Sequence, residues 1–119
     1  MQKTVLIGLH GKESLVDVLK LEFLFDGYTA TFVNTFDPMF THAEQGIYGV
    51  YIMDLNLGSP NSENIDPGIR MYDYVRARVE SGEARFLGIS GNVAAVAAAY
   101  QRGIPACRSA SFILSDFLK

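Results

Sequence analysis

Residues 48–58 read Tyr-Gly-Val-Tyr-Ile-Met-Asp-Leu-Asn-Leu-Gly, a mostly apolar run that ends at the carboxylate of Asp54. An apolar run of this length without polar alternation is typical of a strand that is buried on both faces of a parallel sheet. The run Tyr48 to Met53 is therefore predicted to be a strand that delivers Asp54 to its carboxyl end. Further runs of the same kind lie at residues 5–9, 28–33, 86–89 and 104–107.

A segment with helical character follows each of these runs. The first helix is predicted to start at a capping-box pattern, Ser14 with Asp17 three residues later, and to stop at Asp26-Gly27. The remaining helices are predicted to begin at Asp37-Pro38, at Asp66-Pro67, after the capping residue Asn92, and at Ser111, the last of them running to Lys119.

Alternation of strands and helices predicts an α/β fold with a parallel sheet, because a parallel connection needs a crossover. Five such units without a glycine-rich dinucleotide fingerprint favour the flavodoxin-like (βα)5 three-layer sandwich, with strand order 2-1-3-4-5. We expect residues 1–119 to form one domain of this class. In such sheets, ligands bind beyond the carboxyl ends of the strands, at the switch point between the first and third strands.

Charge and cysteine content exclude several classes of function. The chain carries 10 Lys+Arg against 13 Asp+Glu, so the basic surface of a nucleic-acid-binding protein is missing. No run approaches the ~20 apolar residues of a membrane span, and no signal peptide is evident. Cys107 is the only cysteine, which excludes an internal disulfide and indicates a reducing, cytoplasmic location.

Polar residues follow the first, third and fourth predicted strands. Asp54 comes directly after an apolar strand and is the best candidate for a nucleophile or a ligand, although an Asp there can also cap the following turn. The other residues expected at the same edge of the sheet are His10, Lys12, Asn56 and Ser90.

The order of these strands, helices and polar residues resembles that of a response-regulator receiver domain, of the CheY-like family, over essentially the whole chain. The resemblance rests on the tetrad Asp54-Leu55-Asn56-Leu57 after an apolar strand and on three later segments. These are Asp66-Pro67-Gly68 with Arg70 to Arg76 on a helix, Ser90-Gly91 after the fourth strand, and Gly103-Ile104-Pro105-Ala106.

The resemblance implies a module of two-component phosphorelay signalling rather than an enzyme that turns over a substrate. It implies a histidine kinase as the partner and Asp54 as the phosphoacceptor. It further implies that the Ser90 hydroxyl hydrogen-bonds the phosphoryl oxygens, and that the Asn56 backbone carbonyl is offered to Mg²⁺.

The sequence departs from the family at the metal and cation positions. Leu9-His10-Gly11 stands where the family has an acidic pair, and the family's lysine after the fifth strand falls on Ala110-Ser111. Mg²⁺ prefers hard oxygen ligands, usually including one or two carboxylates, so we expect little Mg²⁺ affinity. The chain is therefore interpreted as an atypical or pseudo-receiver in which Mg²⁺-dependent phosphorylation of Asp54 is disfavoured. Glu13, Glu63 and Asp66 are the acids that could restore a ligand from adjacent loops.

His10 and Lys12 lie near the positions from which those two acids are missing. Our hypothesis is that one of them occupies the cation site and pairs with Asp54, imitating a fixed charge state. The alternative is that His10 is a solvated loop residue and Lys12 an exposed charge.

Two further possibilities concern partners and ligands. The Ala-rich run at residues 93–100 leaves little polar cover, so the face formed by residues 93–119 is a candidate for docking or homodimerisation. The alternative function is a small-ligand- or cofactor-binding domain that uses the loop His10-Gly11-Lys12. That loop lacks phosphate-loop spacing, because Leu6 and Glu13 stand where a glycine and a hydroxyl residue are needed.

Overall fold

A computed structural model describes residues 2–109 of the chain; Met1 and residues 110–119, including the predicted fifth helix, lie outside the described part. Its parallel sheet has the order β2-β1-β3-β4-β5 that the sequence predicts. The strands are β1 (Thr4–Gly8), β2 (Thr29–Val33), β3 (Val50–Asp54), β4 (Arg85–Ser90) and β5 (Ala106–Arg108). The described helices are α1 (Glu13–Phe25), α2 (Phe36–Gln45), α3 (Asp66–Glu80) and α4 (Val93–Gln101).

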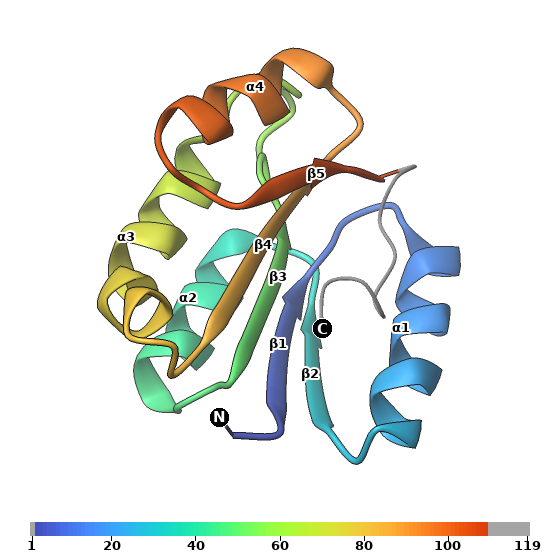
Figure 1. Ribbon diagram of the computed structural model, residues 1–119. Helices are drawn as coiled ribbons and strands as arrows, with labels where there is room; N and C mark the ends of the chain where they lie inside the picture. Colours follow the sequence, from blue (N-terminus) through green and yellow to red (C-terminus); the bar gives the residue numbers. More distant parts are fainter. Residues whose placement is uncertain (1, 110–119) are drawn as a thin grey trace.

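The helices form layers on the two faces of the sheet (Figure 1). Leu19 and Phe23 of α1 pack on one face, against strand residues such as Ile7 and Ile52. Helices α2, α3 and α4 cover the other face, where strand residues of opposite parity, such as Leu6 and Tyr51, are buried. This alternation follows from the two-residue period of a strand and confirms the flavodoxin-like three-layer arrangement. None of the described helices is long and apolar enough to cross a membrane.

Helix α4 begins as predicted, because the Asn92 side-chain oxygen accepts a hydrogen bond of 3.1 Å from the Ala95 amide. The capping-box prediction for α1 was wrong. That helix starts two residues earlier, at Glu13, with Lys12 in place of Ser14 at the cap position and no side-chain cap. Ser14 therefore lies inside the first turn, and the side chain of Lys12 is left free to act elsewhere.

Leu55, directly after Asp54, is held between two glycines. Its side chain is fully buried, and a Cβ added at Gly68 would lie 2.8 Å from Leu55 Cδ2. A Cβ at Gly88 of β4 would come closer still to the same atom. Backbone hydrogen bonds from Leu55 to Ile89 and from Gly68 to Leu55 add to this anchoring. The position of the chain immediately after Asp54 is thus fixed by packing.

Candidate functional site

Asp54 ends β3 at the carboxyl edge of the sheet and is almost completely buried, with an exposed fraction of 3%. Both of its carboxylate oxygens receive hydrogen bonds from the segment that follows β1. The His10 backbone amide donates to Oδ2 at 2.8 Å, and the Lys12 ammonium donates to Oδ1 at 2.5 Å. The buried negative charge is therefore neutralised by a lysine that comes from the first loop of the chain.

The local sequence explains how Lys12 reaches β3. Leu9 is buried in the core on the α1 face and donates a backbone hydrogen bond to Val33 at the end of β2. Gly11 then adopts a positive φ of 68°, a conformation that costs a residue with a side chain about 1–2 kcal/mol. This turn places Lys12 at the start of α1, where its side chain is 26% exposed while its ammonium lies on Asp54.

The remaining predicted site residues lie near Asp54 but make local contacts. Ser90 ends β4 beside β3 and is buried, and its hydroxyl accepts a hydrogen bond of 3.0 Å from the Asn92 amide. The Asn56 side-chain amide donates to the Ser59 carbonyl at 3.3 Å. Within the described part of the chain, the His10 imidazole has no hydrogen-bond partner, so His10 contacts Asp54 through its backbone alone.

A polar hollow of about 520 Å³ opens beside the ion pair. His10, Lys12, Asp54 and Asn56 line it, as sequence reasoning expected for this edge of the sheet. That reasoning missed the other members of the lining. Asn34 and Thr35 follow β2, and the same strand-end rule would have found them. Gly58, Ser59 and Pro60 lie in the long irregular stretch of residues 55–65, which the turn-forming residues at its centre mark as a candidate functional loop.

The groups available at this edge of the sheet do not match the oxygen ligands that Mg²⁺ prefers. In the stretch Leu9-His10-Gly11, Leu9 is buried in the core, and the backbone amide of His10 donates to Asp54, whereas a metal ion needs groups that supply lone pairs. No group of three or more His, Cys, Asp or Glu residues that could hold a metal occurs among the described residues, and the residues that line the hollow beside Asp54 do not include Glu13, Glu63 or Asp66. A metal at the Asp54 carboxylate would have to displace the Lys12 ammonium.

Cys107 of β5 packs partly against the core on the α1 face. Burial raises the pKa of its thiol above the ordinary value, which favours the neutral, unreactive form. The residue therefore behaves as a small apolar side chain.

Comparison with known proteins supports the fold. No protein-family model matches the chain, and no curated protein does. Among solved structures, the chain is similar to the non-phosphorylated HemR receiver domain from Leptospira biflexa, with a TM-score of 0.62 and 18% sequence identity. The match covers 98% of this chain and 89% of that one. A parallel sheet in this order is the flavodoxin-like α/β fold, and here a buried aspartate lies at its switch point. The chain has the fold of a two-component receiver domain.

Proposed function

We propose that this chain is an atypical receiver domain of two-component signalling that works through protein contacts and without Mg²⁺-dependent phosphorylation of Asp54. The observation that carries the proposal is the Lys12 ammonium on the buried Asp54 carboxylate. In this proposal, the Lys12–Asp54 ion pair imitates a fixed charge state of the site. A reducing, cytoplasmic setting fits a chain with a single cysteine.

The chemistry of phosphoryl transfer supports this proposal. Transfer to a carboxylate requires a free oxygen to attack and positioned cations to stabilise the charge on the transferring oxygens. Here Oδ1 and Oδ2 of Asp54 both accept hydrogen bonds, and the carboxylate is almost fully buried. Lys12 neutralises the nucleophile itself, so its charge is not free for an incoming phosphoryl group.

The proposed output surface is α4. Val93 and Tyr100 on this helix are 60% and 64% exposed, and the residues between them are mostly alanine. The Asn92 side-chain amide at the start of α4 donates to the Ser62 hydroxyl at 3.0 Å, which connects the helix to the loop that follows Asp54. We propose that a histidine kinase or another signalling protein contacts this surface. A homodimer through residues 93–119 is the second possibility, and residues 110–119 of that face lie outside the described part.

Binding of a small ligand or cofactor at the His10-Gly11-Lys12 loop is the alternative function, and its anionic form is the weaker one. An anion at this loop would need the Lys12 charge, and the ammonium is already engaged by Asp54.

Incubation of the full chain with acetyl phosphate and Mg²⁺, followed by intact mass spectrometry, tests the proposal. We expect no mass increase of one phosphoryl group. A phosphorylated species that disappears in an Asp54→Asn variant would contradict it. An Asp37→Asn variant, with the same change of charge on α2, serves as the matched control.

A further inference from the structure

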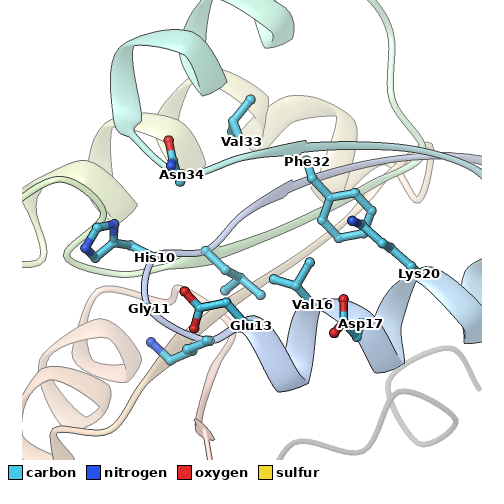
Figure 2. Close-up of a pocket in the computed structure, with 11 residues that line it drawn as sticks. His10, Gly11, Glu13, Val16, Asp17, Lys20, Phe32, Val33 and Asn34 are labelled. Carbon is cyan, nitrogen blue, oxygen red and sulfur yellow. The ribbon is translucent and has the colours of Figure 1, made fainter.

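A second hollow lies on the other side of the β1–α1 loop, between α1 and the end of β2 (Figure 2). Its volume is about 560 Å³, within the range of small-molecule sites. Leu9, Val16, Phe32 and Val33 supply apolar surface, and charged residues of α1 lie along the rim. His10, Lys12 and Asn34 line both hollows, whereas Asp54 lines only the first; we call the second hollow the α1–β2 groove.

Two carboxylates of α1 line the groove without a cationic partner in the described part of the chain. Glu13 and Asp17 lie one helical turn apart on α1, and among the described residues neither carboxylate has an ion-pair or hydrogen-bond partner. Like charges at this spacing repel each other. The positive helix N-terminus offsets Glu13, in the first turn, more than Asp17, which lies farther from it. The Lys12 ammonium does not compensate them, because it lies on Asp54.

A lysine side chain of the protein lies over the Phe32 ring of the groove. The Lys20 ammonium lies 5.1 Å from the centroid of the Phe32 ring, within the range of cation–π attraction. Figure 2 shows this nitrogen over the ring, with Asp17 on the same stretch of α1. Lys20 is an exposed residue with a long side chain, so it can leave the ring without unfolding the helix.

We propose that the α1–β2 groove binds a small organic cation, a primary ammonium or guanidinium compound with an apolar body. The cationic head takes the place of the Lys20 ammonium on Phe32, near Asp17, and the apolar body lies on Val16 toward the Glu13 end of the groove. An anion is disfavoured by the unpaired carboxylates. A bare metal ion is disfavoured because, within the part of the chain that the structure describes, no group of three metal-binding side chains occurs.

Three probes with the same apolar body test the sign of the charge. Phenethylammonium, 2-phenylethanol and phenylacetate are titrated separately into the isotope-labelled full chain, and backbone amide shifts are followed by NMR. We expect phenethylammonium to bind at least about threefold more tightly than the neutral alcohol, with shifts centred on Phe32, Val33 and Asp17. Equal binding of the three probes, or absence of shifts at these amides, overturns the proposal.

Variants locate the binding. Phe32→Leu and Asp17→Asn should each weaken phenethylammonium binding severalfold, whereas Lys20→Ala should strengthen it by removing the competing ammonium. Asp37→Asn, on α2 and outside the groove, is the control for net charge and should have no effect. The proposal fails if Lys20→Ala weakens binding, or if Asp37→Asn acts as strongly as Asp17→Asn. These outcomes do not depend on whether Asp54 accepts a phosphoryl group.

Discussion

At the scale of single residues, the contact between Lys12 and Asp54 sets the chemistry of the site. The positions of the site residues could be predicted from the sequence, because residues that follow β1, β3 and β4 all lie at the carboxyl edge of the parallel sheet. The contacting atoms could not. Gly11 turns the chain so that His10 presents its amide, while the ammonium of Lys12 reaches the carboxylate. Which atoms contact Asp54 therefore depends on the backbone turn at Gly11, and hydrophobic periodicity in the sequence does not reveal such a turn.

Loss of Lys12 should leave a buried carboxylate without its cation. We expect Lys12→Ala to lower the free energy of unfolding by about 1–3 kcal/mol, as for other buried charged acceptors that lose a partner. Asp54→Asn should cost less, because its side-chain oxygen can still accept from the His10 amide and Lys12 can extend into water. Urea denaturation of both variants and of the double variant measures the coupling. An unchanged midpoint for Lys12→Ala contradicts the buried ion pair.

The thiol of Cys107 gives a pH-dependent prediction. Burial raises its pKa, so the thiolate fraction near neutral pH is smaller in the folded than in the unfolded chain. We expect a disulfide reagent to label the native protein slowly and the urea-unfolded protein rapidly. Because only the unfolded chain then readily loses the proton, stability should fall as the pH rises above about 8.5. Equally fast labelling of both states contradicts this prediction.

At the scale of elements, the link between β3 and α3 positions Asp54. The apolar run and its terminal aspartate predicted the strand, but the sequence did not show that Leu55 fills the space left by Gly68 and Gly88. Glycine positions inside strands and helices indicate close approach only once the neighbouring element is known. The start of α1 was mispredicted for a similar reason, because Ser14 matched a cap pattern that the preceding turn does not use.

Gly88→Ala should destabilise the protein by about 1–3 kcal/mol, because the added methyl group overlaps the Leu55 side chain. The displacement should also shift the backbone amide signals of Asp54 and Leu55 in NMR spectra. Gly91→Ala is the matched control: its Cβ would meet nothing within 4 Å, and the residue directly follows β4. Equal effects of the two substitutions would show that Leu55 is not pinned as described.

At the scale of the whole molecule, strand order and layers could be predicted because alternating strands and helices leave few ways to cover a parallel sheet. Which side chains of α4 are exposed could not be predicted in the same way. Exposure of Val93 and Tyr100 depends on how α4 is rotated on the sheet, and its Ala-rich sequence has only a weak pattern.

If α4 serves contacts and not folding, replacing its exposed apolar residues should leave stability unchanged. We expect the Val93→Ser, Tyr100→Ser double variant to keep the denaturation midpoint within about 0.5 kcal/mol of the wild type. The same variant should show weaker association with a partner protein or a second copy by sedimentation velocity. A clear loss of stability would place these side chains in the folding core instead.

The central claim is that Lys12 occupies Asp54 in place of the metal-dependent phosphoryl chemistry of receiver domains. An NMR titration of the full chain with beryllofluoride and Mg²⁺, a mimic of the phosphorylated carboxylate, tests it most directly. We predict that the amides of Asp54, Leu55 and Ser90 do not shift. Saturable shifts centred on these residues in the wild-type chain, absent from Asp54→Asn, would contradict the account.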